Sequence, residues 1–292
     1  MAKGTKELKQ RITGVQNIQQ ITRAMEMVAT QKLKRLQARA DAARPFSGKI
    51  QQMVGRLAGS VRPELSALLQ ERDGETTANL VITSDKGMCG GYNANMVRFA
   101  TGELNADQGE QRVYVLGRKG DIMLRARGIS PDHVHSDAVD RIGFDRARAI
   151  AKELVAEFLD GTVDRVRLVY TSFQSAARQS PVSVTILPID PTSLLEQSST
   201  DGGSGANRDF IVEPDEEALL QSLLPKFLEV KVYSAILESL ASEFTARRNA
   251  MKQATDAADD MIGALRRQYN RARQESITSE LLEVSSGAEA LK

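Results

Sequence analysis

Two stretches without proline, residues 1–44 and 226–292, carry their apolar side chains at a spacing typical of paired helices. In the first stretch the apolar positions advance 28 residues in eight steps of 3.5, and in the second 35 residues in ten steps. A 3.5-residue repeat keeps one seam of a helix facing a partner helix, as in a coiled coil. The predicted seams are Leu8, Ile12, Val15, Ile18, Thr22, Met25, Ala29, Leu33 and Leu36, and Val230, Tyr233, Leu237, Leu240, Phe244, Arg247, Met251, Ala254, Ala258, Ile262 and Leu265.

The two seams lie at opposite ends of the sequence, which predicts an antiparallel pair joined through a middle domain. At about 1.5 Å per residue the second helix would reach roughly 100 Å, so it would form a rod. A homodimeric coiled coil is the alternative. Against it, the polar Thr22 and Arg247 lie in the seam, and small residues such as Ala29 and Ala258 favour close approach of two backbones over bulky dimer contacts. We therefore favour pairing within one chain.

Between these stretches, short apolar runs alternate with helical patterns. Strands are predicted at residues 79–83, 112–116, 166–170 and 182–187, and helices at 93–104, 118–127 and 144–159. Such alternation is typical of βαβ units with a parallel sheet. The predicted fold is α/β: a small Rossmann-like domain plus a long antiparallel two-helix coiled coil. The expected boundaries are 1–61 for the first helix, 62–212 for the α/β domain with a flexible loop near 198–208, and 213–292 for the last helix, kinked or restarted at Pro225.

The composition and the first residues of the chain indicate the cellular compartment in which we expect the protein. The chain has no run of 18 apolar residues, and its start, MAKGTKELKQ, is polar and leads directly into the helical pattern. Neither a membrane-spanning helix nor a signal peptide is therefore expected. With Cys89 as the single cysteine, no internal disulfide forms, and we expect a reducing cytoplasm, most simply a bacterial one.

The net charge of +1 conceals an uneven distribution. Residues 1–44 hold ten Lys and Arg against three acidic residues, residues 226–292 balance, and the middle is therefore acidic. A basic helix implies acidic partners. Nucleic acid is one such partner, but only 4% of residues are aromatic, tryptophan is absent, and no recognised nucleic-acid motif appears.

The segment TSDKGMCGGYN, residues 83–93, follows a predicted strand and precedes a helix, where phosphate-binding loops lie. Its glycines match neither the P-loop order nor GxGxxG. A tight turn with glycines at positive φ is the favoured interpretation. A partner contact through the charged Asp85 and Lys86 is a third possibility. Cys89 has no neighbouring base in the sequence, so nucleophilic catalysis is not expected.

His133 and His135 are the two histidines of the chain. On a strand both would point to one face, as two metal ligands do, with Asp132 or Asp137 needed to complete a site. A solvated loop after Pro131 is the favoured interpretation, and no metal or cofactor is expected.

Four segments together resemble the gamma subunit of F-type ATP synthases. They are residues 15–35 (VQNIQQITRAMEMVATQKLKR), the loop TSDKGMCGGYN, residues 223–255 in the second helix, and residues 269–290 (YNRARQESITSELLEVSSGAEA). Their order matches that family, and they cover both ends and the middle domain.

The resemblance implies a central rotor without an active site of its own. One copy would stand in a hexamer of three alpha and three beta subunits, beside the epsilon subunit and the membrane c ring. It would bind no nucleic acid and would touch the bacterial cell membrane only through the c ring, on the cytoplasmic side. A basic coiled-coil adaptor and an enzyme built on the α/β domain are the rival functions. By resemblance, the beta contacts are Met25, Lys32, Arg35, Asp85, Lys86, Arg273, Gln274, Thr278 and Glu280, and Ala288 and Leu291 lie in an apical bearing.

Overall fold

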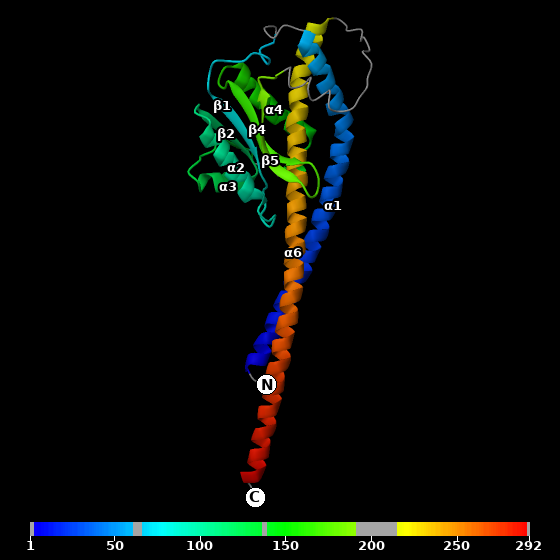
Figure 1. Ribbon diagram of the computed structural model, residues 1–292, viewed down its shortest axis with the longest axis vertical. Helices are drawn as coiled ribbons and strands as arrows, with labels where there is room; N and C mark the ends of the chain where they lie inside the picture. The colour runs from blue at the N-terminus through cyan, green and yellow to red at the C-terminus, as the bar shows by residue number, and fades with distance from the viewer. Residues whose placement is uncertain (1–2, 61–65, 136–138, 191–214, 291–292) are drawn as a thin grey trace. The chain divides into compact units, whose positions relative to one another are not determined.

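The computed structural model describes residues 3–60, 66–135, 139–190 and 215–290. The chain forms two compact units, Met1–Gln31 with Arg247–Lys292, and Lys32–Ala246. Two long helices, α1 (Lys3–Ser60) and α6 (Glu216–Ala290), contribute residues to both (Figure 1). The predicted α/β fold with long terminal helices is confirmed.

The first unit is an antiparallel helix pair. The Thr22 and Thr255 hydroxyls lie 2.8 Å apart, and Gln19 donates a hydrogen bond to Asp259, so residue numbers rise along α1 as they fall along α6. The predicted intramolecular pair is thus confirmed. The seam prediction is wrong at Ile18, which is 56% exposed because the neighbouring Gln19 faces α6 in its place.

The second unit contains a five-stranded sheet. Its strands are β1 (Thr77–Ile82), β2 (Gln111–Leu116), β3 (His133–His135), β4 (Arg165–Phe173) and β5 (Gln179–Leu187), in the order β3-β2-β1-β4-β5. The first four strands are parallel, as the buried apolar runs predicted for β1, β2 and β4, and β5 pairs antiparallel with β4 at the edge.

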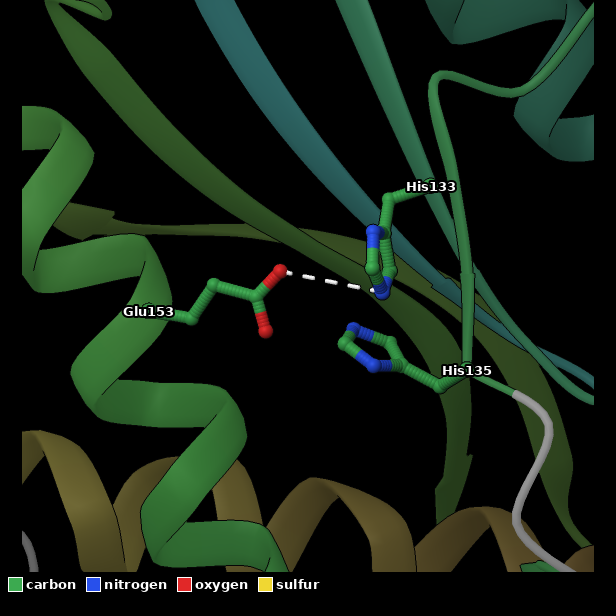
Figure 2. A group of neighbouring side chains, drawn as sticks. All are labelled: His133, His135 and Glu153. Carbon is green, nitrogen blue, oxygen red and sulfur yellow. Dashed lines mark ion pairs between the residues drawn. The ribbon is translucent and has the colours of Figure 1, made fainter.

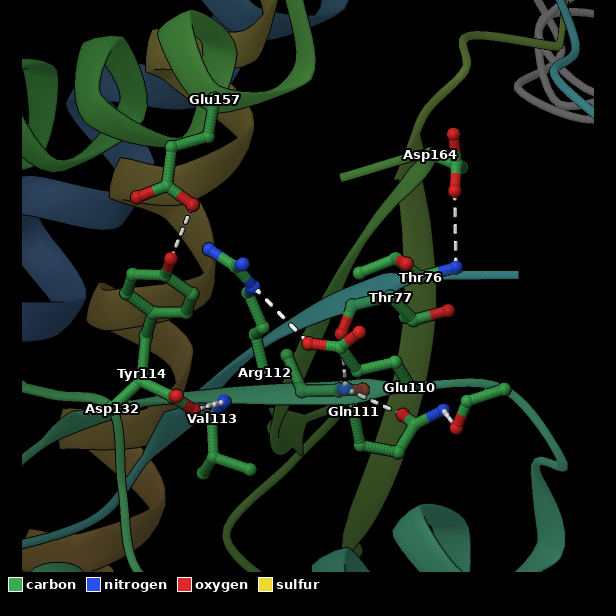
Figure 3. A network of polar contacts seen from close by, with 12 residues as sticks. Thr76, Thr77, Glu110, Gln111, Arg112, Val113, Tyr114, Asp132, Glu157 and Asp164 are labelled. Atoms are coloured by element: carbon green, nitrogen blue, oxygen red, sulfur yellow. Dashed lines mark hydrogen bonds and ion pairs between the residues drawn. The ribbon is translucent and has the colours of Figure 1, made fainter. Parts of the chain in front are cut away.

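Helices cover the sheet in the manner of a βαβ fold. Helices α2 (Tyr92–Ala106) and α3 (Arg118–Arg125) pack on one face, where Val81, Val113 and Val115 meet them in a buried cluster. Tyr114 alternates with these valines and so points to the other face, where its hydroxyl donates to Glu157 of α4 (Phe144–Leu159). Figure 3 shows this contact. Strand alternation therefore assigns α4 to the face opposite α2 and α3.

Buried hydrogen bonds tie α2 to α6 within the second unit. The Tyr92 hydroxyl lies 3.0 Å from the Ser239 hydroxyl and 3.2 Å from the Ser239 carbonyl oxygen. Burial raises the pKa of Tyr92 above its usual range, and the Glu243 charge adds to the effect. The phenol thus stays neutral and joins the two helices as a hydrogen-bonding group.

Two local predictions from the sequence are wrong. The restart predicted at Pro225 is one of them: helix α6 continues through Pro225, where the neighbouring Leu224 and Leu228 are fully buried and hold the backbone helical. His133 and His135 lie in strand β3, not in a solvated loop, because their backbone pairs with Tyr114 and Leu116 of β2. The loop predicted near 198–208 lies outside the described residues. Within the described part of the chain, no helix is long and apolar enough to cross a membrane.

Candidate partner-binding surface

The loop between β1 and α2 is held in shape by its own side chains. Asn93 Nδ2 donates to the Ser84 hydroxyl at 2.7 Å and contacts the Cys89 sulfur at 3.3 Å. Gly90 has a φ of 57° and Met88 a φ of 60°. The predicted tight turn is confirmed, although Gly90 is the one glycine of this loop with positive φ, and Met88 adopts the second left-handed position. Cys89 is buried at the base of the turn.

Asp85 has a structural task in this loop. Its carboxylate accepts hydrogen bonds from the backbone N–H of Arg118 at 3.2 Å and of Val139 at 2.8 Å. The first joins the loop to the start of α3, and the second to the short 3-10 helix Val139–Arg141. The sequence predicted Asp85 as a partner contact, and the structure adds that it positions the loop.

Lys32 of α1 reaches the same 3-10 helix. Its ammonium lies 2.5 Å from the Asp140 carboxylate and 5.1 Å from the centre of the Phe244 ring of α6. The hydrogen bond from Lys32 holds the pKa of Asp140 below its usual range, against the opposing effect of burial. The charge of Lys86 lowers it further.

Lys32, Asp85, Lys86 and Asp140 therefore form one group, here called the lysine–aspartate cluster. Three of its members were predicted from the sequence. Asp140 was missed because it lies in a polar segment 108 residues beyond Lys32, and no periodic pattern connects the two. Lys86 is the exposed member of the cluster at the tip of the turn, and the nearby Met88 is 61% exposed. The turn thus presents a cation and an apolar side chain to solvent.

The other predicted contact residues are distributed between the two units. Arg35 is exposed in the second unit, and Met25 is half-buried in the first. Leu291 lies outside the described residues, and of Ala288 the structure describes the helical backbone only. The remaining predicted residues are all exposed on α6: Arg273, Gln274, Thr278 and Glu280.

Large apolar side chains are also exposed along the last turns of α6, in the first unit. Ile277, Leu281, Leu282 and Val284 are between 44% and 72% exposed. The sequence signal for them was the end of the 3.5-residue seam at Leu265, after which apolar residues continue without a predicted partner. Contiguous exposed apolar side chains are typical of surfaces that bind another protein. We call these four residues the α6 apolar end.

Comparison with known proteins extends this picture. The family model described as ATP synthase matches residues 4–291. An ATP synthase gamma chain from Moorella thermoacetica is 42% identical over 287 residues, covering 98% of this chain and 99% of the relative. A gamma chain from Anaeromyxobacter sp. is 42% identical over 293 residues, with coverages of 98% and 99%.

Two solved structures are similar as well. A chain from the central stalk and c ring of the Tetrahymena thermophila mitochondrial ATP synthase is 27% identical with a TM-score of 0.59, covering 80% of this chain and 99% of that chain. A chain from the OSCP/F1/c-ring structure of the Euglena gracilis mitochondrial ATP synthase has a TM-score of 0.68 at 20% identity, with coverages of 99% and 94%. The second similarity is one of fold.

Proposed function

The chain belongs to the ATP synthase gamma-chain family, and from that premise we propose that it is the central rotor shaft of an F-type ATP synthase. Ion flow through the membrane would turn a c ring, the ring would turn this chain, and the chain would drive three catalytic beta subunits in turn through their conformations. ATP hydrolysis would run the same sequence in reverse. The chain transmits force in this scheme, and the chemistry takes place on beta.

The α6 apolar end is the observation that carries this proposal. These side chains continue a long helix beyond its paired part and are exposed in the chain by itself. Burying them releases roughly 25 cal/mol per Å² of apolar surface, which favours insertion into a protein environment. An apolar bearing formed by the surrounding hexamer supplies that environment, and Ala288 and Leu291 would complete the contact.

The polar contacts fit a surface that meets three identical partners in succession. Exposed ion pairs contribute about 0 to 1 kcal/mol each, so a charged surface guides a partner without holding it. At the lysine–aspartate cluster we assign the direct contact with beta to Lys86. Arg35, which lies close to Lys32 in the sequence of basic α1, would contact beta as well. Asp85 positions the turn through its two backbone contacts, and Lys32 holds the 3-10 helix through Asp140. Met25 would contact beta nearer the N-terminus of α1, and four residues of α6 would also contact beta: Arg273, Gln274, Thr278 and Glu280.

The proposed assembly contains one copy of this chain with three alpha subunits, three beta subunits and an epsilon subunit, standing on the c ring. Its place would be the cytoplasmic side of a bacterial cell membrane, as a peripheral protein whose membrane contact runs through the c ring. The alternative function as a basic adaptor for nucleic acid has no support among the relatives, which are ATP synthase gamma chains.

Reconstitution tests the proposal directly. The full chain is mixed with alpha and beta subunits, and the purified product is assayed for ATP hydrolysis. We expect a complex with one copy of this chain and an ATPase activity that depends on it. A chain ending at Gln274 should lose assembly or coupling while its circular dichroism retains the sheet signal. Failure of the full chain to assemble with alpha and beta would contradict the proposal.

A further inference from the structure

Strand β3 places two imidazoles on one face of the sheet. His133 and His135 pair in parallel register with Tyr114 and Leu116 of β2, so both rings lie on the face toward which Tyr114 points. Helix α4 covers that face, since the Tyr114 hydroxyl donates to Glu157 (Figure 3).

Glu153 of α4 lies directly opposite the two rings. Figure 2 shows its carboxylate pointing toward both imidazoles. The distance from His133 Nε2 to Glu153 Oε1 is 3.8 Å, and the centroids of the two rings are 4.6 Å apart. One ligand atom from each residue can be chosen so that all three lie within 4.8 Å of one another. The side chains thus converge on one point from two elements.

We propose that His133, His135 and Glu153 bind a divalent first-row transition cation, with Zn²⁺ as the preferred ion and water completing its coordination. Imidazole nitrogen suits zinc, copper, iron and nickel, and two imidazoles with one carboxylate form a known zinc ligand set. Calcium and magnesium prefer sets made of oxygen alone, so this site discriminates against them.

The geometry needs only a small adjustment to hold the ion. Ligand atoms around a tetrahedral zinc lie about 3.4 Å apart, so the three atoms, now within 4.8 Å of one another, must close by up to about 1.4 Å. His133 and Glu153 have half-exposed side chains that rotate without disturbing the core, with side-chain exposures of 50% and 35%. The buried His135 is the fixed member of the site.

An ion pair between His133 and Glu153 is the simpler interpretation of the same residues. That pair is long and partly exposed and is worth about 0 to 1 kcal/mol, so it accounts poorly for the approach of three potential ligand atoms to within 4.8 Å of one another. Asp132, a carboxylate considered from the sequence, is not among the three residues that converge, and its Oδ2 accepts the Val113 N–H at 2.7 Å. Asp137 lies outside the described residues.

A bound cation would join the edge strand β3 to α4. Strand β3 has three residues and a single neighbour in the described sheet, so it is the strand held by the fewest hydrogen bonds. Metal binding to the folded site raises stability by mass action. The inference concerns the sheet domain by itself and is independent of the proposed rotor role.

Zinc titration of the full chain tests the proposal. The protein is prepared without a histidine tag and treated with a chelator, because its two histidines are then the only ones in the sample. Isothermal titration with Zn²⁺ should show one site, and thermal unfolding should shift upward with zinc. Mg²⁺ should give neither signal. The absorption spectrum of bound Co²⁺ should report imidazole ligation.

Two variants and a control decide the outcome. His133→Ala and Glu153→Gln should each weaken zinc binding about tenfold or more, while Asp145→Asn, the same kind of substitution at an exposed position of α4, should leave it unchanged. Both test positions are partly exposed, so the variants should fold, and circular dichroism checks this. Equal zinc affinity in all four proteins, or the lack of a saturable site in the full chain, would overturn the proposal.

Discussion

The pairing of Lys32 with Asp140 makes the stability of the second unit depend on pH. The pKa of Asp140 is lower in the folded chain than its unfolded value of about 3.9. Its charge therefore adds stability that is fully present above the unfolded pKa and is lost as the pH falls through the folded pKa. The same charge holds the 3-10 helix against α1.

We predict that Lys32→Gln lowers the free energy of unfolding by about 0.5 to 1 kcal/mol at pH 7, since both partners are partly exposed. The difference should shrink as the pH falls below the unfolded pKa of about 3.9 and through the lower folded pKa of Asp140. Urea unfolding across this pH range measures it. Lys34→Gln, an exposed neighbour on α1, is the control. A deficit of equal size at both ends of the range would contradict the prediction.

Gly117 is a second residue whose identity is fixed by its surroundings. It precedes α3 with a φ of 108°, and a Cβ there would lie 2.5 Å from the backbone oxygen of Thr83. We predict that Gly117→Ala costs about 2 to 5 kcal/mol, from backbone strain and overlap together. Gly128→Ala is the matched control, because its φ of 81° is also left-handed but its Cβ would meet open space.

The control variant should cost about 1 to 2 kcal/mol from backbone strain alone. Thermal or urea unfolding of both variants gives the comparison. Equal losses of unfolding free energy in Gly117→Ala and Gly128→Ala would contradict the prediction, because the overlap with Thr83 would then cost nothing.

At the scale of elements, the helix pair of the first unit is held by a buried polar contact. The Thr22 and Thr255 hydroxyls contact each other, and each also lies within hydrogen-bond distance of a carbonyl oxygen of its own helix. Because a hydroxyl has one hydrogen, one threonine donates to the other, which donates to its own helix. Replacing one hydroxyl by a methyl removes the cross-helix bond, whereas replacing both leaves an apolar contact of the same shape.

We predict that Thr22→Val and Thr255→Val each cost about 0.5 to 1.5 kcal/mol and that the double variant costs less than their sum. Urea unfolding of the four proteins in a double-mutant cycle measures the difference. Thr13→Val with Thr278→Val, exposed positions on the same two helices, should be additive. Additivity at the buried pair would contradict the prediction.

An element could be predicted from the sequence when the residues that determine it are close together along the chain. Helix α4 was predicted with its observed bounds, because its apolar face is regular and Asp160 with Gly161 ends it, Gly161 having a φ of 75°. Strand β3 was missed, because Val134 is its single apolar residue and its pairing with β2 is not visible along the chain. Short edge strands depend on their neighbours for their structure.

The same distinction holds for the candidate partner-binding surface: its residues within one loop were predicted, and a contact between distant segments was not. Lys86 and Asp85 were identified from a motif within one loop, which sequence resemblance detects. The partner of Lys32 was not, since Asp140 comes from a distant polar segment. The complete group of His133, His135 and Glu153 was not predicted for the same reason, because its carboxylate comes from the helix that follows the strand.

At the scale of the whole molecule, the described residues offer partners both charged surface, on basic α1 and at Lys86, and apolar surface, above all the α6 apolar end. The charges give weak, salt-dependent contacts, whereas burial of apolar side chains supplies most of the binding free energy. The apolar end should therefore dominate the affinity for the surrounding subunits. Substitutions there should weaken assembly and leave folding nearly unchanged, because these side chains are exposed in the isolated chain.

We predict that the double variant Leu281→Asn with Leu282→Asn changes the free energy of unfolding of the isolated chain by no more than about 0.5 kcal/mol. Its affinity for alpha and beta subunits should fall about fivefold or more, since loss of an interface anchor costs about 1 kcal/mol or more. Titration of the labelled chain into those subunits measures this. Ile122→Asn, at a similarly exposed residue of α3, should assemble normally. Unchanged affinity of the double variant would mean that the charged contacts, and not the α6 apolar end, hold the chain in its complex.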